Sequence, residues 1–278
     1  MADSNVSEFS PRNYETIFIS DVHLGARGCQ ADRLLKFLQR TTCNHLVMVG
    51  DIIDGWQLKS RLYWPDTHMM VVREILKKSR TGTKITYVTG NHDEFLRRYS
   101  DVELGNIQLV DELHLETKAG KKFLVIHGDQ FDVVTRYARW LSSLGDVGYN
   151  ILLKANVLLN KLRAQFGFGY WSLAKWAKDS VKQAVNFIGD FESAVSQECS
   201  RRGFDGVVCG HIHKTAIRQF QDIEYLNCGD WVESCTAILQ RHDGGFEIFD
   251  AFQNQKDLDS PTTPGASGGH DVHSRDAA

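Results

Sequence analysis

The sequence predicts one large α/β domain. Apolar runs over 16–20 and 45–49 have the length and composition of buried strands, and the segment between them, 31–40, carries leucines at helical spacing. A strand, a helix and a second strand in this order form a βαβ unit, whose two strands are parallel. A chain of 278 residues is long enough for one such domain with an insertion.

The later elements indicate that the sheet becomes mixed. An aromatic loop over 56–64 and a helix over about 66–79 precede the next strand. The segment 118–121 has the composition of a hairpin turn, so the strands on either side of it are expected to be antiparallel. Further strands are expected at 84–88, 107–117, 121–127, 214–220, 223–228, 235–240 and 245–250.

Composition divides the chain into a domain, an insertion and two polar ends. The domain is expected at 15–252, after a flexible N-terminus, 1–14, and before a disordered tail, 253–278, that is rich in Asp, Ser, Pro, Thr and Gly. Residues 132–190 lack a strand pattern and repeat apolar side chains every 3.6 residues, which predicts a helical insertion of about three helices.

The insertion is also basic and aromatic. Between positions 136 and 188, eight basic and two acidic residues give a net charge of +6, against −3 for the whole chain. This combination is typical of helices that cap an acyl chain or contact anionic lipid headgroups. The alternative is a solvated basic face over an ordinary aromatic core.

The overall composition favours a cytoplasmic protein. Apolar residues at 42% and charged residues at 24% are ordinary for a globular chain, and a net charge of −3 gives no reason to expect a nucleic acid partner. The six cysteines form no C-x-x-C pair, the N-terminus lacks the basic-then-apolar order of a secretory signal, and no apolar run could span a bilayer. Peripheral contact with the inner face of a membrane stays open, as does the oligomeric state.

Five predicted strand ends carry side chains that bind metals. The pattern is clearest at Gly50–Gly55, where an aspartate follows a buried strand and glycines allow a tight turn. Isolated histidines such as His45 and His68 are more often core or surface residues. The clustered candidates are Asp21, His23, Asp51, Asn91, His127, His211 and His213.

These residue types predict a two-metal centre. Carboxylate, imidazole and amide oxygen together suit Mn, Fe or Zn, whereas a structural zinc would favour cysteine. Seven candidates exceed one tetrahedral site, and Asp51 is the best bridge between two ions. Two such ions clamp phosphoryl oxygens and generate a hydroxide nucleophile near neutral pH. A metal-bound hydroxide is therefore expected to attack a phosphate ester or pyrophosphate.

The motifs Asp21–His23, Gly50–Asp54, Gly90–Asp93, His127–Asp129 and Gly210–His213 resemble, in order, the five blocks of the calcineurin-like metallophosphoesterase superfamily. The resemblance implies a four-layer α/β/β/α sandwich. It assigns Asp21, His23, Asp51 and His213 to one ion, and Asp51, Asn91, His127 and His211 to the other. It also implies that His92 contacts the scissile phosphate or protonates the leaving oxygen, with Asp93 or Asp54 as its orienting partner.

Within the superfamily, the chain most resembles the UDP-2,3-diacylglucosamine diphosphatases of lipid A synthesis. The segments 127–132 and 229–234 and a helical lid between the fourth and fifth blocks carry this resemblance. That family usually has arginine where this chain has His92, a departure that leaves open a paralogue with a different substrate. The leading hypothesis is hydrolysis of a nucleotide-linked lipid such as UDP-2,3-diacylglucosamine. The alternatives are a general phosphomonoesterase or phosphodiesterase on soluble substrates and a non-catalytic, metal-stabilised scaffold.

Overall fold

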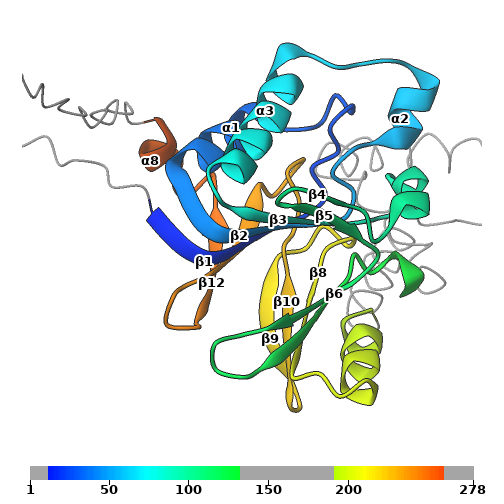
Figure 1. Ribbon diagram of the computed structural model, residues 1–278, viewed down its shortest axis with the longest axis vertical. Coiled ribbons are helices and arrows are strands. Elements are labelled where there is room, and N and C mark those ends of the chain that lie inside the picture. The colour runs from blue at the N-terminus through cyan, green and yellow to red at the C-terminus, as the bar shows by residue number, and fades with distance from the viewer. Residues whose placement is uncertain (1–11, 132–190, 260–278) are drawn as a thin grey trace, which may run out of the picture.

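The computed structural model describes residues 12–131 and 191–259, which form two sheets that pack face to face (Figure 1). The larger sheet has the order β12-β11-β1-β2-β3-β5-β4. Strands β1, β2, β3 and β5 are parallel, and antiparallel pairs add β11 and β12 at one edge and β4 at the other. Its strands are β1 (Arg12–Ile19), β2 (Thr41–Val49), β3 (Lys84–Val88), β4 (Glu103–Leu104), β5 (Ile107–Val110), β11 (Thr236–Gln240) and β12 (Phe246–Asp250).

The smaller sheet has the order β6-β7-β8-β10-β9. Its three central strands, β7, β8 and β10, are parallel, and both edge strands are antiparallel to their neighbours. The expected change from a parallel to a mixed arrangement is therefore confirmed. The strands are β6 (Leu113–Glu116), β7 (Lys122–Val125), β8 (Gly206–Cys209), β9 (Ala216–Phe220) and β10 (Ile223–Asn227).

Alternating side chains build three apolar layers between these elements. In β1, Ile17 and Ile19 face the helices α1 (Ala31–Arg40) and α3 (Asp66–Arg80), whereas Phe18 faces the other sheet. In β7, Phe123 lies between the sheets and Leu124 packs under the helix over 191–201. Helices therefore cover the outer face of each sheet, and the predicted four-layer α/β/β/α sandwich is confirmed.

The structure divides one predicted strand in two. Residues 107–117 were expected to be continuous, but β5 belongs to the larger sheet and β6 to the smaller one. The break falls at Asp111, whose carboxylate accepts a hydrogen bond of 2.7 Å from the Thr89 hydroxyl, and at Glu112, which pairs with Arg202. The hydrophobic pattern could not reveal this break, because apolar residues stand at alternate positions in both halves, at 107, 109, 113 and 115.

The prediction of an aromatic loop at 56–64 is wrong for the first half of that segment. Gly55–Ser60 form a short helix, α2, because the Asp54 carboxylate caps it by accepting a hydrogen bond of 2.8 Å from the Gln57 backbone N–H. Two short 3-10 helices lie nearby: η1 (Glu94–Tyr99) follows the third motif, and η2 (Asp129–Phe131) begins at the last residue of the fourth. All three short helices therefore lie beside the candidate site.

Ordered structure extends past both expected boundaries of the domain. Strand β1 begins at Arg12, within the N-terminus expected to be flexible, and Tyr14 is buried. Helix α8 (Gln255–Asp259) lies within the tail expected to be disordered, because Leu258 is buried and Asp259 pairs with Lys36 of α1 at 2.6 Å. The predicted insertion, 132–190, lies outside the described residues.

Candidate metal centre

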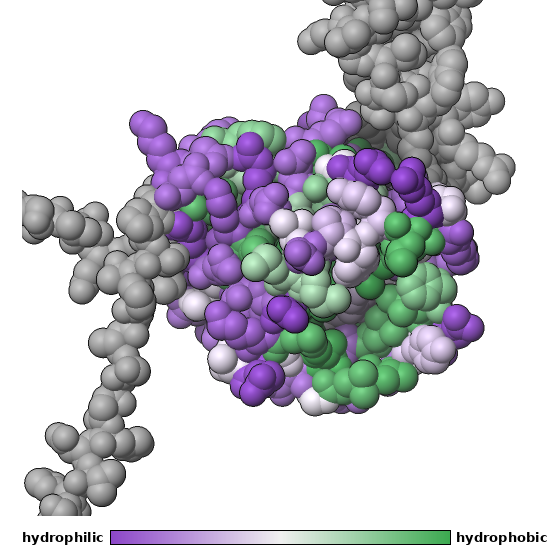
Figure 2. Space-filling model, turned by 90° about the horizontal axis from the view of Figure 1, so that it is seen from above, coloured by the Kyte–Doolittle hydropathy of each residue, from purple (hydrophilic) through white to green (hydrophobic). Residues whose placement is uncertain are grey.

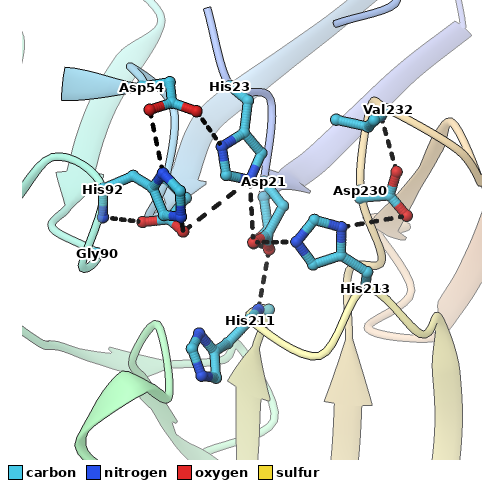
Figure 3. A network of polar contacts seen from close by, with 12 residues as sticks. Asp21, His23, Asp54, Gly90, His92, His211, His213, Asp230 and Val232 are labelled. Carbon is cyan, nitrogen blue, oxygen red and sulfur yellow. Dashed lines mark hydrogen bonds and ion pairs between the residues drawn. The ribbon is translucent and has the colours of Figure 1, made fainter. Parts of the chain in front are cut away.

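The candidate side chains from both sheets meet at one end of the sandwich (Figure 3). Each follows the carboxyl end of a strand, where parallel strands of open α/β sheets place their ligands. Asp21 and His23 follow β1, Asp51 follows β2, Asn91 follows β3, His127 follows β7, and His211 and His213 follow β8. All seven side chains expected to bind metal are therefore located on one edge of the two sheets.

Five of these residues have a left-handed backbone. Among the described residues, eight non-glycine residues have positive φ, and five of them are Asp21 (51°), His23 (54°), Asp51 (53°), His211 (69°) and His213 (53°). Non-glycine residues rarely adopt this conformation, and it concentrates at functional sites. Hydrogen bonds from the Asp21 backbone N–H to the Gly50 carbonyl and from the His23 backbone N–H to the Asp51 carbonyl hold these tight turns.

Two carboxylates organise the imidazoles. The Asp21 Oδ1 atom lies 3.2 Å from His213 Nε2 and 3.9 Å from His23 Nε2. The Asp51 Oδ2 atom lies 3.4 Å from His127 Nε2 and 4.0 Å from His23 Nε2. The Nδ1 atom of His211 lies 3.3 Å from His127 Nε2. Asp51 is thus placed between two groups of imidazoles, which is the position of a bridging carboxylate.

Several polar atoms at this point fit a divalent cation. His23 Nε2 and both side-chain amide atoms of Asn91 are buried without a hydrogen-bond partner. Buried polar atoms are nearly always satisfied in proteins, so these atoms need an additional partner. A Cβ on Gly90 would overlap the Asp51 carboxylate, so glycine is required where this turn approaches the centre. Oxygen and imidazole donors suit Mn, Fe or Zn.

The ring nitrogens that face away from the centre have their own partners. His23 Nδ1 lies 3.3 Å from Asp54 Oδ2, and His127 Nδ1 donates to the Val49 carbonyl oxygen over 3.0 Å. His213 Nδ1 lies 4.0 Å from Asp230 Oδ2. Outer partners of this kind fix the tautomer and orientation of a metal-binding histidine. In each of these three histidines, Nε2 is the atom that faces the centre.

The buried carboxylates strongly affect the titration of the imidazoles. Burial opposes charge on His127, but the Asp51 and Asp21 carboxylates outweigh it and raise its pKa to about 10. Asp21 likewise outweighs burial at His213 and raises the pKa to about 9. Burial raises the Asp21 pKa, but the His213 and His127 imidazoles hold it well below its usual range. This negative potential favours cations, and a metal competes with protons for the same nitrogens.

His92 lies at the rim of the centre and is held on three sides. Its Nδ1 atom lies 3.1 Å from Asp54 Oδ1, and its backbone N–H donates to Asp51 Oδ1 over 2.8 Å. The Trp56 ring packs on the imidazole with centroids 4.0 Å apart, and the His23 ring meets it edge-on at 4.6 Å. Between the two aspartates suggested as its orienting partner, Asp54 is the one in contact.

Asp93 has a structural role instead. Its fully buried carboxylate accepts hydrogen bonds from the backbone N–H groups of Gly90 (2.6 Å) and Ile52 (2.9 Å) and from the Tyr87 hydroxyl (2.6 Å). These bonds join the turn after β2 to the turn after β3. Asp93 therefore holds the two turns that carry Asp51 and Asn91.

Replacing Tyr87 with phenylalanine is expected to destabilise the fold. The substitution removes one donor from a buried carboxylate, and a hydrogen bond to a charged group contributes about 1.5–3 kcal/mol. Urea unfolding of metal-free protein should show a decrease of about this size in the free energy of unfolding. Tyr99→Phe, at a half-exposed tyrosine, is the matched control and should change little. Equal stability of the two variants would contradict the role given to Asp93.

The structure adds two residues that sequence reasoning had not placed at the site. Asp230 accepts hydrogen bonds from the backbone N–H groups of Val232, Glu233 and Ser234, and it approaches His213. The Gly-Asp pair after β10 repeats the signal that located Asp51, so it could have been recognised. Trp56 had no such signal, because the aromatic residues of 56–64 looked alike in sequence.

Comparison with known proteins identifies the family. A sequence model described as calcineurin-like phosphoesterase matches residues 15–215, which is more than half of the chain. A UDP-2,3-diacylglucosamine hydrolase of Haemophilus ducreyi is 23% identical over 239 residues, covering 83% of this chain and 97% of that protein. One from Neisseria meningitidis serogroup B is 27% identical over 238 residues, covering 84% and 95%.

Solved structures of phosphoesterases are also similar to this chain. An archaeal phosphodiesterase has a TM-score of 0.41 at 12% identity, covering 84% of this chain and 98% of that chain. A phosphoesterase from E. coli has a TM-score of 0.41 at 13% identity, covering 84% and 97%. The family match and the hydrolase relatives lead to one conclusion: the chain belongs to the calcineurin-like phosphoesterase family and is a phosphoester hydrolase.

Proposed function

We propose that the chain hydrolyses the pyrophosphate of a nucleotide-linked lipid with two divalent metal ions. One ion would be held by Asp21, His23, Asp51 and His213, and the other by Asp51, Asn91, His127 and His211. The observation that carries the proposal is the position of Asp51 Oδ2, which lies within 4.0 Å of His23 Nε2 on one side and 3.4 Å from His127 Nε2 on the other. The donor set favours Mn²⁺, with Fe or Zn as alternatives.

The residues around His92 support a role in proton transfer. Two divalent ions, when bound, polarise a phosphoryl group and make water acidic enough to attack near neutral pH. Contact with Asp54 at Nδ1 leaves His92 Nε2 directed toward Asp51 Oδ2, at 3.9 Å. A proton held at Nε2 can therefore be donated to the leaving oxygen of a phosphate bound beside Asp51.

The substrate proposal draws on the relatives and on the insertion. The curated relatives that cover most of this chain are named UDP-2,3-diacylglucosamine hydrolases. A basic, aromatic insertion is suited to a substrate with both phosphate and acyl chains. Among the described residues, no helix is long and apolar enough to cross a membrane. The proposed lipid substrate would reach the centre through peripheral contact of the protein with the inner face of the membrane.

A substrate screen with ³¹P NMR tests this function. Protein loaded with Mn²⁺ would be incubated in parallel with UDP-2,3-diacylglucosamine, a CDP-linked lipid and a phospholipid. Hydrolysis of a pyrophosphate consumes one water and gives two phosphomonoesters, so the UDP-lipid should produce two new monoester resonances. Chelated protein is the control and should produce none. Turnover of the phospholipid with no turnover of either nucleotide-linked lipid would contradict the proposal.

One observation favours a second candidate function. His92 stands where the diacylglucosamine family that the chain resembles usually has arginine. A histidine can protonate a leaving oxygen, whereas an arginine stays charged and can only bind the phosphate. A general phosphomonoesterase or phosphodiesterase on soluble substrates would use such an acid. Higher kcat/KM for soluble esters than for any lipid in the screen would favour this alternative.

A further inference from the structure

Exposed apolar side chains gather at the end of the molecule that carries α2 and the start of α3 (Figure 2). Leu62 is 81% exposed and Met70 is 50% exposed. We call this the 56–77 surface; its exposed apolar side chains are Trp56, Leu62, Met69, Met70 and Leu76. Large apolar side chains grouped on a surface mark a site of interaction.

Basic side chains accompany the apolar ones. Between positions 56 and 77, four basic and two acidic residues give a net charge of +2, against −3 for the whole chain. Glu74 pairs with Lys77 at 3.2 Å. The remaining cations, Lys59, Arg61 and Arg73, are exposed. The surface therefore complements an anionic partner, although the protein as a whole is weakly acidic.

Contacts on its buried side hold the loop that carries Leu62 in place. The rings of Tyr63 and Trp64 meet the buried His68 ring edge-on, with centroids 5.7 and 5.6 Å apart. His68 Nδ1 accepts a hydrogen bond of 3.1 Å from the Gly25 backbone N–H. These contacts tie the loop to the turn that follows His23. Leu62 is thus exposed on a well-packed loop, and its exposure does not contribute to the stability of the folded chain.

The surface begins at the candidate centre. Trp56, its first residue, packs on His92, and the surface continues along α2, the following loop and the outer side of α3. A partner seated here would lie directly beside the site of hydrolysis. This continuity suggests that the partner carries the substrate.

We infer that the 56–77 surface docks on an anionic lipid bilayer, an inference that rests on the proposed lipid substrate. Leu62 and Met70 would enter the interface, and Lys59 and Arg61 would face lipid phosphates. Trp56, which is 42% exposed, suits the headgroup region. The positive charge of the surface and its continuity with a centre proposed to act on a lipid favour an anionic bilayer over a protein partner.

Vesicle co-sedimentation tests the surface. Wild-type protein should bind phosphatidylglycerol vesicles more strongly than phosphatidylcholine vesicles, and it should dissociate as salt screens the attraction. Leu62→Ser should lower the partition coefficient by about tenfold, because the leucine side chain no longer leaves water. A double variant in which glutamine replaces both Lys59 and Arg61 should lower the partition coefficient by a similar factor.

An exposed leucine elsewhere provides the matched control. Leu104 on the edge strand β4 is 73% exposed, so Leu104→Ser removes the same side chain from a different surface. This control should bind vesicles as the wild type does. All variants should keep the wild-type thermal unfolding and the wild-type turnover of bis-p-nitrophenyl phosphate, since none of the substituted residues touches the metal centre.

The possible outcomes distinguish a failure of the proposed docking surface from a failure of the proposed function. Unchanged vesicle binding by Leu62→Ser, or equal losses in Leu62→Ser and Leu104→Ser, would overturn the surface whatever the substrate. Self-association without vesicles that disappears in Leu62→Ser, measured by analytical ultracentrifugation, would assign the surface to a second copy of the chain and also overturn it. Binding that depends on Leu62 but without turnover of any lipid would support the surface and contradict the proposed function.

Discussion

Replacing Asp51 with asparagine is expected to empty at least one metal site and to lower kcat/KM by about 10³-fold or more, because loss of an ion removes several kcal/mol of charge stabilisation from the transition state. The physical reason is the position of the carboxylate between His23 and His127. The neutral amide cannot balance two dications. The measurements are metal content per chain and turnover of bis-p-nitrophenyl phosphate.

The fold should survive this substitution. Asparagine tolerates the left-handed backbone at position 51, where φ is 53°, and its amide oxygen can still accept the His92 backbone N–H. Asp101→Asn is the matched control, because Asp101 is exposed and also has a left-handed backbone, with φ of 69°. Two ions per chain and near-normal turnover in Asp51→Asn would rule out a bridging role.

Replacing His92 with alanine is expected to lower kcat by roughly 10²–10⁴-fold while the metal content stays unchanged, because this is the usual contribution of one acid–base or oxyanion contact. The loss should be smaller for esters of p-nitrophenol than for alkyl esters, since an acidic leaving group needs no proton. The measurement is kcat across a series of leaving groups. His114→Ala, at an exposed histidine, is the control and should be neutral.

Two further substitutions show how His92 acts. Asp54→Asn should weaken the orientation of both His92 and His23 while keeping the cap on α2, because asparagine is also a good cap. Trp56→Phe should keep more activity than Trp56→Ala, since a smaller ring still packs on the imidazole. Equal losses in His92→Ala for good and poor leaving groups would assign His92 to electrostatic positioning instead of proton transfer.

Short-range patterns were enough to locate the candidate side chains. A buried strand needs a run of apolar residues, and the turn after it needs glycine or a small polar residue, so Asp51 and His127 could be found from their neighbours alone. The same patterns predicted α1 and α3, since their apolar faces repeat every 3.6 residues. The family resemblance supplied the pairing of these motifs and the four-layer arrangement, which no single motif implies.

Long-range contacts determined the remaining features. Strands β5 and β6 are separated by two residues and join different sheets, because hydrogen bonds to β3 and to β7 compete for the same stretch. Asp54 and Asp93 each end a motif that starts with glycine after a strand, so the sequence does not distinguish them. The turns around them direct the Asp54 carboxylate to His92 and the Asp93 carboxylate to Tyr87. Hydrogen bonds between the turns that follow β1 and β2 accompany the left-handed backbone at Asp21 and His23. A pattern of residues along the chain carries no information about such distant partners, so these features depend on the folded structure.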